Sequence, residues 1–269
     1  MKRALTIGGS DSGGGAGIQA DLKTFAAFGV YGTTAITAIT AQNTVEVTRI
    51  DAIDPAMVAA QIEAVAADIG VDAVKTGMLA SAAIIKAVAA AVTARALPQL
   101  VVDPVMISKS GASLLADDAV ATLVARLLPL ALVVTPNLPE AERLAGRTIV
   151  TLEDRREAAR RIAGLGPRIV VVKGGHADGD EVIDLVYDGQ RFLEIRGPRV
   201  ATRSTHGTGC TFSAAITAGL ALGRTPLEAI AGAREYLTAA LRAAPGIGRG
   251  AGPLDHFHAL RPRPGHVDD

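Results

Sequence analysis

The sequence predicts a three-layer α/β/α fold with a mostly parallel central sheet. Short, continuously apolar runs alternate with segments of helical periodicity along most of the 269 residues. Strands that are apolar on both faces belong to sheets covered by helices on both sides. Hydrophobic residues make up 49% of the chain and aromatic residues only 3%, so the core must be aliphatic and closely packed. The chain has neither an internal repeat nor a linker, which favours a single domain.

The strand candidates are short apolar runs spread along the chain. They are Leu5–Gly8, Thr33–Thr40, Val45–Ile50, Ala73–Thr76, Leu100–Asp103, Leu132–Thr135 and Ile169–Lys173. The pattern changes over Val182–Ile195, where two alternating runs flank Asp188 and Gly189. Alternation around such a dipeptide predicts a β-hairpin with a tight turn.

Helices are predicted from their start signals and their apolar faces. Asp54 before Pro55 is an N-cap followed by a proline in the first turn. The apolar residues that then share one helical face are Val58, Ile62, Val65 and Ile69. Ser81 opens a second helix, and Thr151 with Asp154 resembles a capping box. The two long helices that close the fold are Gly209–Gly223 and Pro226–Arg242.

The predicted domain ends before the last residues of the chain. Residues 1–245 are predicted to form the single domain. The segment 246–269 is rich in Gly, Pro and Arg, and we expect it to be a loosely ordered tail.

Charge and cysteine content narrow the function classes. Basic and acidic residues both number 27, so no overall field recruits nucleic acid or a membrane surface. A single cysteine excludes an internal disulfide and a cysteine-cluster metal site, and favours the cytoplasm. The apolar run Ala4–Ile7 is too short for a signal-peptide core. The uncharged stretch Thr24–Val45 contains glycines and many polar residues, so it is not expected to span a membrane.

Polar residues follow the strand candidates at their carboxyl ends. These clusters are residues 9–17, Gln42-Asn43-Thr44, Thr76-Gly77-Met78, Asp103-Pro104-Val105-Met106, Thr135-Pro136-Asn137 and Lys173-Gly174-Gly175-His176. In an open parallel sheet, ligands bind at the carboxyl ends of the strands. The clusters therefore predict one binding cleft along this edge.

Gly207-Thr208-Gly209-Cys210 lies immediately before an apolar run of small residues. Short side chains leave the first N–H groups of a helix free to face an anion, and the helix dipole favours negative charge there. The same position is expected to lower the pKa of the Cys210 thiol. An ordinary loop-to-helix joint with an inert, packed cysteine is the alternative.

The sequence fits neither a dinucleotide-binding fold nor a P-loop fold. Gly15–Ala20 matches a relaxed dinucleotide pattern, but the next strand ends at Gln42 and not at an acidic residue. No glycine run is followed by the Lys-Ser/Thr pair of a P-loop.

Six motifs in this order resemble the hydroxymethylpyrimidine and phosphomethylpyrimidine kinases of thiamine biosynthesis, which are ribokinase-like. They are GGSDSGGGAGIQADLKTF (Gly8–Phe25), AITAQNT, DPVM, TPNLPEAE, VVKGGH and THGTGCT. The resemblance spans residue 4 to about residue 223. It implies a ribokinase-like fold, ATP and Mg²⁺ as cofactors, a small pyrimidine substrate and a homodimer.

The resemblance assigns Gln42 to the pyrimidine. Its amide offers one acceptor and two donors, which suits an exocyclic amino group beside a ring nitrogen; a surface glutamine is the alternative. Asp21 and Gly9 line the same cleft by analogy, although Asp21 fits a solvated helix position equally. Met78 and Val105 would supply apolar walls for a flat ring, or belong to the core.

Charged residues at the same rim suit phosphate and magnesium. Asp103 precedes Pro104, which forces an extended exit and aims the carboxylate at the rim. Asn137 and Glu140 have the Asn-x-x-Glu spacing that ribokinase-like enzymes use near magnesium and phosphate; Glu140 also suits a helix N-terminus. Lys173 ends an apolar run, and its ammonium would neutralise charge on a transferring phosphoryl group.

The remaining candidates are less specific. Asn137 and Thr208 are expected to contact ATP phosphates, and Gly207, Thr208 and Gly209 to stabilise the transferring group. Cys210 stands where many ribokinase-like sugar kinases have an aspartate base, so it is either a base or only part of the anion site. His176 and His206 have no partner at metal-ligand spacing, and we expect local hydrogen bonds for both.

Together these observations predict an ATP-dependent kinase. The expected reactions are phosphorylation of 4-amino-5-hydroxymethyl-2-methylpyrimidine to the monophosphate and then to the diphosphate. A pyridoxal kinase on the same scaffold is the nearest alternative. A non-catalytic protein that binds a vitamin precursor is less consistent, because binding alone needs no triphosphate site.

Overall fold

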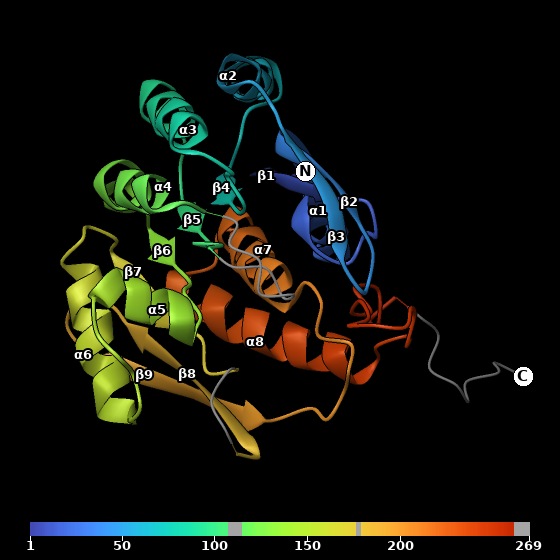
Figure 1. Ribbon diagram of the computed structural model, residues 1–269, viewed down its shortest axis with the longest axis vertical. Coiled ribbons are helices and arrows are strands. Elements are labelled where there is room, and N and C mark those ends of the chain that lie inside the picture. The colour runs from blue at the N-terminus through green and yellow to red at the C-terminus, as the bar shows by residue number, and fades with distance from the viewer. Residues whose placement is uncertain (107–114, 176–178, 261–269) are drawn as a thin grey trace, which may run out of the picture.

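The computed structural model describes residues 1–106, 115–175 and 179–260 (Figure 1). In this part of the chain the strands form one nine-stranded sheet, in the order β3-β2-β1-β4-β5-β6-β7-β8-β9. The parallel strands are β1 (Arg3–Asp11), β2 (Tyr31–Gln42), β4 (Ala73–Thr76), β5 (Leu100–Val102), β6 (Val133–Val134) and β7 (Ile169–Val172). The antiparallel strands are β3 (Val47–Ala52), β8 (Glu181–Tyr187) and β9 (Phe192–Pro198). The predicted, mostly parallel sheet is confirmed.

Helices cover both faces of the sheet, as Figure 1 shows. One face carries α1 (Gly17–Ala27), α7 (Thr208–Ala221) and α8 (Pro226–Arg242). The other carries α2 (Pro55–Ala64), α3 (Ala82–Ala94), α4 (Asp117–Thr122), α5 (Leu138–Ala145) and α6 (Leu152–Ala163), with short η1 (Val65–Ile69), η2 (Leu123–Leu127) and η3 (Leu128–Leu130) turns. A separate aliphatic core fills each space between sheet and helices. The three layers follow from strands that are apolar on both sides.

The predicted helix starts are confirmed by their caps. Asp54 accepts hydrogen bonds from the N–H groups of the first turn of α2, and Ser81 does the same for α3. Thr151 and Asp154 form a reciprocal capping box at the start of α6. The apolar face predicted for α2 is only partly correct, because the chain widens into a π-turn at Val65 and leaves that residue half-buried.

The hairpin around Gly189 is also present. β8 and β9 pair from Tyr187 and Phe192 onward. The Asp188 carboxylate accepts the N–H groups of Gln190 and Arg191 at 2.9 and 2.8 Å, which fixes the turn. Gly189 has a φ of +91°, a value that favours glycine.

The expectation of a loose tail is wrong for the described residues around 250–258. Leu254, Asp255 and His256 are buried. His256 Nε2 lies 2.9 Å from Thr211 Oγ1 of α7, and Tyr236 of α8 donates its hydroxyl to the His256 carbonyl at 2.6 Å. Glycine and proline removed the periodicity that would have indicated structure, but Leu254, Asp255 and His256 between them pack against the domain.

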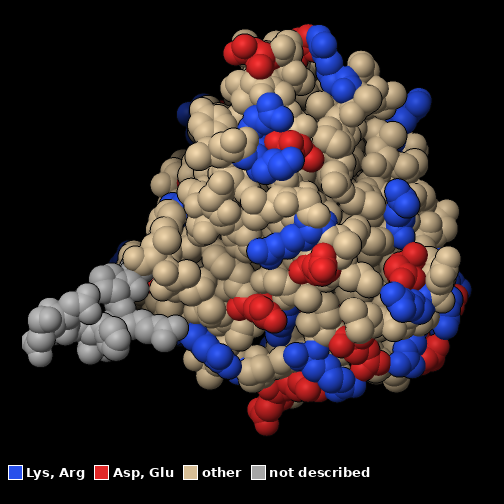
Figure 2. Space-filling view, turned by 180° about the vertical axis from the view of Figure 1, so that it is seen from behind, with Lys and Arg blue, Asp and Glu red and all other residues tan. Residues whose placement is uncertain are grey.

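In the described residues, no helix combines the length and the apolar character needed to cross a bilayer. On the face seen in Figure 2, basic and acidic side chains are interspersed over a largely uncharged surface.

Candidate active site

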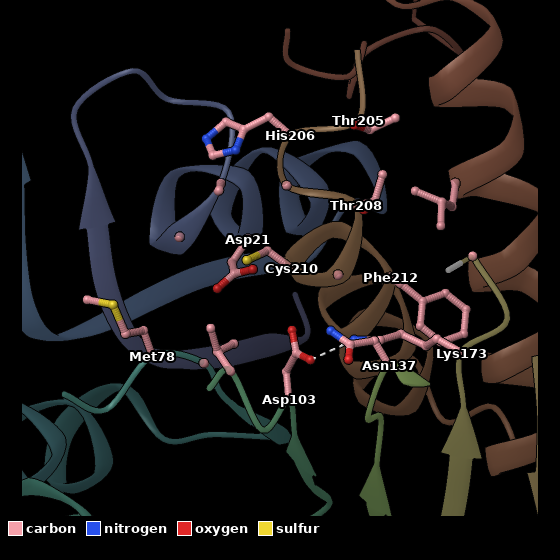
Figure 3. A pocket seen from close by; sticks show the side chains of 18 of the residues that line it. Asp21, Met78, Asp103, Asn137, Lys173, Thr205, His206, Thr208, Cys210 and Phe212 are labelled. Atoms are coloured by element: carbon pink, nitrogen blue, oxygen red, sulfur yellow. Dashed lines mark hydrogen bonds and ion pairs between the residues drawn. The ribbon is translucent and has the colours of Figure 1, made fainter. Parts of the chain in front are cut away.

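A cleft of about 440 Å³ opens at the carboxyl ends of the parallel strands. Each strand-end cluster of the predicted rim contributes to its lining or lies beside it. The cleft brings together all thirteen site residues singled out from the sequence: Gly9, Asp21, Gln42, Met78, Asp103, Val105, Asn137, Glu140, Lys173, Gly207, Thr208, Gly209 and Cys210. Several of them are labelled in Figure 3. The residues predicted from separate motifs therefore line one cleft.

The glycine-rich segment before α7 has the geometry expected of an anion site. α7 begins at Thr208, and its N-cap Gly207 has no side chain to accept the first N–H groups. Gly207 has a φ of +82°, and a Cβ there would overlap the Gly15 carbonyl. Only glycine permits both this backbone conformation and this close approach. The first N–H groups of α7 thus lie at the cleft without a side-chain cap from Gly207.

Cys210 differs from the expectation. Burial raises the pKa of its thiol to about 11, and the nearby Asp21 and Asp103 carboxylates raise it further against the opposing effect of Lys75. Figure 3 shows the sulfur close to Asp21. The predicted low pKa is wrong, because loss of water and two negative neighbours outweigh the helix terminus. The thiol is neutral at neutral pH.

A buried ion pair lies at the base of the cleft. Lys75 Nζ is 2.7 Å from both carboxylate oxygens of Asp21, and Thr6 donates its hydroxyl to the same group at 2.6 Å. Both charged side chains are only 1% exposed, so the alternative of a solvated Asp21 is wrong. Burial lowers the pKa of Lys75, but Asp21, together with Cys210 and Asp103, raises it more, so the net shift is upward and the ammonium stays charged. Sequence analysis missed Lys75, although a lysine inside an apolar strand was a usable signal.

Asp103 and Lys173 form a second pair at the centre of the cleft. Lys173 Nζ is 2.9 Å from Asp103 Oδ1, as the dashed line in Figure 3 marks. Ser213 donates to the other oxygen at 3.3 Å. Burial lowers the pKa of Lys173, but Asp103 and Glu140 raise it more, so the net shift is upward. The positive charge of Lys173 lies close to the start of α7, because a Cβ on Gly209 would be 3.3 Å from Lys173 Nζ. The ammonium and the first N–H groups of α7 therefore face the same part of the cleft.

Asn137 and Glu140 begin α5 with a reciprocal capping box. The Asn137 N–H donates to Glu140 Oε2 at 2.8 Å, and the Glu140 N–H donates to Asn137 Oδ1 at 2.9 Å. The helix-terminal role of Glu140 is confirmed, and its side chain also lines the cleft. Burial raises the pKa of Glu140 to about 7, with Lys173 opposing this shift and Asp103 adding to it.

Gln42 lies at one end of the cleft beside His206 and Asp11. His206 Nε2 is 2.8 Å from Asp11 Oδ2 and 3.3 Å from Gln42 Nε2. The local hydrogen-bonding role predicted for His206 is confirmed, whereas His176 lies outside the described residues. Asp11 was part of a motif but was not recognised as a site residue. Met78, Val105 and Gly9 line this end.

The opposite end of the cleft is an apolar slot that the sequence did not indicate. It is lined by Val182, Pro198, Val200, Phe212, Leu237 and Leu241. These residues come from the hairpin, the segment after it, and two helices, so no local motif unites them. At its edge, Asp184 accepts the Gly174 N–H at 2.7 Å and pairs with Arg234 at 3.4 Å.

In the described part of the chain, no three His, Cys, Asp or Glu side chains are grouped closely enough to hold a metal ion. Asp103 and Glu140 are carboxylates that line the cleft near Lys173. A divalent cation here would need further oxygen ligands from a bound molecule or water.

Comparison with known proteins agrees with this architecture. The family model described as Phosphomethylpyrimidine kinase matches residues 11–255. A hydroxymethylpyrimidine/phosphomethylpyrimidine kinase from Synechococcus elongatus is 52% identical over 258 residues, which cover 96% of this chain and 98% of that protein. The thiamine biosynthesis bifunctional protein ThiED of Geobacter sulfurreducens is 53% identical over 95% of this chain, which spans only 52% of that protein's length.

Solved structures give the same fold. The ADP complex of Bacillus subtilis pyridoxal kinase has a TM-score of 0.91 and 42% sequence identity, with 97% of this chain and 100% of that chain covered. Its similarity supports the ribokinase-like fold. The extent of the family match, together with the identity of the full-length relative, shows that the chain belongs to the phosphomethylpyrimidine kinase family.

Proposed function

We propose that this protein transfers the γ-phosphoryl group of ATP to the hydroxymethyl group of 4-amino-5-hydroxymethyl-2-methylpyrimidine. It then phosphorylates the monophosphate to the diphosphate in the same cleft. The observation that carries this proposal is the presence of two chemically different regions in one cleft. Gln42 provides amide hydrogen bonds at one end, and Lys173 faces the free N–H groups of α7 in the middle.

The apolar slot beyond Lys173 suits the nucleotide base, and the central charges suit the triphosphate. Lys173 would neutralise charge on the transferring group, while the N–H groups at residues 208–210 would donate hydrogen bonds to its equatorial oxygens. Asn137 and Thr208 line the same region and are proposed to contact phosphate oxygens. The acceptor hydroxyl would lie between this anion site and Gln42, next to the group to be transferred.

Magnesium fits the donor set without a protein cage. Asp103 and Glu140 are the residues that would hold it, with phosphate oxygens and water as the other ligands, a coordination that Mg²⁺ commonly takes. The ion would supply positive charge to the phosphates. Asp103 is itself kept in place by Lys173, Thr135 and Ser213.

Cys210 is proposed to be part of the anion site and not the base. A thiol with a pKa of about 11 is almost wholly protonated at neutral pH. Loose phosphoryl-transfer transition states need little help from a base. The contribution of Cys210 would then come from its backbone N–H and from the shape of its side chain.

Pyridoxal phosphorylation is the second candidate, because the similar Bacillus subtilis structure is that of a pyridoxal kinase. Pyridoxal also carries a hydroxymethyl group, and the phosphate end of the cleft would serve both substrates. The experiment that decides between them measures ATP consumption by purified protein with hydroxymethylpyrimidine, its monophosphate, pyridoxal and ribose. Turnover with both pyrimidines is expected, and turnover with pyridoxal alone would overturn the assignment.

A homodimer in the cytoplasm is also proposed, as the family resemblance and the single cysteine imply. β3 is an edge strand of the described sheet. Ile39 and Val45 beside this edge are 53% and 56% exposed, which leaves apolar surface for a second copy. Sedimentation velocity is expected to give twice the monomer mass, and an Ile39→Glu variant should sediment as a monomer.

A further inference from the structure

The Gln42 amide lies between the side chains of His206 and Thr40. Its nitrogen is 3.3 Å from His206 Nε2, and its oxygen is 3.2 Å from Thr40 Oγ1. The nitrogen and oxygen ends of an amide have almost the same shape, so the partners decide which end faces which group. Both partners here have a defined hydrogen-bonding role.

Asp11 determines the tautomer of His206. Asp11 is 2% exposed, and its Oδ2 accepts the N–H groups of Gly15 and Ala16 at 3.0 and 2.8 Å as well as a bond from His206 Nε2 at 2.8 Å. Burial raises the pKa of this carboxyl, but His206 and the N–H groups lower it more, so it is ionised. An ionised carboxylate only accepts hydrogen bonds. His206 Nε2 must therefore carry its one proton, so it has no lone pair with which to accept from Gln42 and can only share this N–H with an acceptor atom of the Gln42 amide.

Thr40 has the opposite role. Its hydroxyl has one proton, and the carbonyl of Ser10 is the nearer acceptor at 2.7 Å. Once that proton is donated, the Thr40 oxygen can only accept from Gln42. Thr40 is 6% exposed, so water does not replace these partners easily.

The rest of the fold prevents His206 from turning away. The backbone N–H of His206 donates to the Gly252 carbonyl at 3.1 Å. The His206 ring lies against Gly15, where a Cβ would be 2.6 Å from His206 Cδ2. Pro253 of the C-terminal segment packs on the same glycine at 3.2 Å from that Cβ position. The C-terminal segment therefore fixes the His206 backbone and packs on Gly15, against which the ring lies.

We propose that His206, Asp11 and Thr40 are positioning residues that fix the orientation of the Gln42 amide. In this orientation the amide is turned over relative to the distances given above, so that its carbonyl faces His206 and its NH₂ faces Thr40. One oxygen lone pair and one N–H then remain for the acceptor, in a fixed order. This arrangement selects a ring that presents an amino donor next to a ring-nitrogen acceptor in the matching order. The inference rests on the proposed function, because it takes Gln42 as the residue that contacts the acceptor.

A double-mutant cycle tests this inference. His206→Ala is expected to raise the acceptor KM about 5- to 50-fold, the effect of losing one hydrogen bond that orients a buried polar group, with the ATP KM nearly unchanged. Thr40→Val should act in the same direction. In a Gln42→Ala background, each substitution should add less than about threefold, because residues that act through one group are not additive.

A substrate analogue gives a second readout. In the 4-oxo analogue of hydroxymethylpyrimidine, the exocyclic donor becomes an acceptor and the ring nitrogen becomes a donor. The parent enzyme should reject it, and His206→Ala should reduce this discrimination by about tenfold because the amide can then turn over. His206→Gln, which restores a donor, should recover part of the acceptor affinity.

Controls separate positioning from general damage. His258→Ala changes a histidine on the same C-terminal segment that contacts Tyr236 and not Gln42, and it should behave like the parent enzyme. Thermal unfolding of each variant checks folding. Additive effects in the Gln42→Ala background, or unchanged discrimination in His206→Ala, would overturn the inference. If the parent phosphorylates pyridoxal and no pyrimidine, the proposed function fails, and the same cycle run with pyridoxal still decides whether His206 acts through Gln42.

Discussion

Cys210 lies in the first turn of α7, where the helix dipole favours a thiolate, yet the pKa of the thiol is raised to about 11. Removal from water and the Asp21 and Asp103 carboxylates determine the result. The position of Cys210 at the start of a helix could be predicted from the sequence. The two carboxylates that face it come from other elements, so their effect required the fold.

The raised pKa predicts slow alkylation. At pH 7 the thiolate fraction of Cys210 should be on the order of a hundredfold below that of an ordinary cysteine, and its reaction with iodoacetamide should be slower in proportion. The unfolded chain is the matched control, because it contains the same single cysteine. Mass spectrometry over time measures both rates. Equal rates in folded and unfolded protein at pH 7 would contradict the raised pKa.

The raised pKa of Glu140 indicates that its negative charge lowers the stability of the fold, although the proposed magnesium site needs that charge. Its pKa is raised from 4.5 to about 7 in the folded protein, so the fold favours the neutral carboxyl. This contribution to stability is complete below pH 4.5 and is lost as the pH rises through 7. Without metal or nucleotide, Glu140→Gln should therefore be more stable than the parent at pH 8, by on the order of 2–4 kcal/mol, and nearly equal to it at pH 5.

The same substitution should lower magnesium-dependent turnover, because one negative charge near the proposed ion is removed. Denaturant unfolding at both pH values and a magnesium titration of initial rates measure the two effects. A Glu140→Gln variant with parent-like turnover would leave Glu140 as a helix-capping residue only.

At the scale of elements, one buried contact joins β8, α8 and the loop that carries Lys173. Asp184 is 3% exposed, accepts the Gly174 N–H and pairs with Arg234. A Cβ on Gly174 would overlap the Ile183 carbonyl, so the loop lies directly on β8. Asp184 thus orients Gly174, which directly follows Lys173 in the chain.

Removing Asp184 should affect both stability and catalysis. Asp184→Ala leaves Arg234 buried without its partner and should cost about 3–5 kcal/mol in the free energy of unfolding. It should also lower kcat, because Lys173 loses its support. Asp184→Asn keeps an acceptor for Gly174 and should retain more activity. Denaturant unfolding and initial rates test this, and a double variant with Arg234→Leu should regain stability but not kcat; equal kcat for Asp184→Ala and the parent would contradict the role.

Local signals predicted most elements well. Proline, N-cap residues and apolar runs marked α2, α3, α6 and α8, and the hairpin turn at Gly189 was correct. The C-terminal segment was not predicted, because its glycines and prolines conceal the few residues that pack. Its partners Thr44, Thr211 and Tyr236 are distant in sequence.

At the scale of the whole molecule, the position of the cleft followed from topology. Parallel strands bring their carboxyl ends to one edge, so polar residues such as Gln42, Asp103 and Lys173 could be assigned to one site before their distances were known. The Lys75–Asp21 pair and the apolar slot could not be assigned in this way. They depend on side chains from several elements, and no motif spans those elements.

Gln42 at one end of the cleft and Lys173 at its centre are proposed to act on different substrates. Steady-state kinetics of Gln42→Ala, with Lys173→Met as the matched variant, tests it most directly. Gln42→Ala should raise the acceptor KM about 5- to 150-fold and leave the ATP KM unchanged, as the loss of a hydrogen-bond partner for a buried polar group predicts. Lys173→Met should instead lower kcat by about 10²-fold or more. An unchanged acceptor KM in Gln42→Ala would contradict the account.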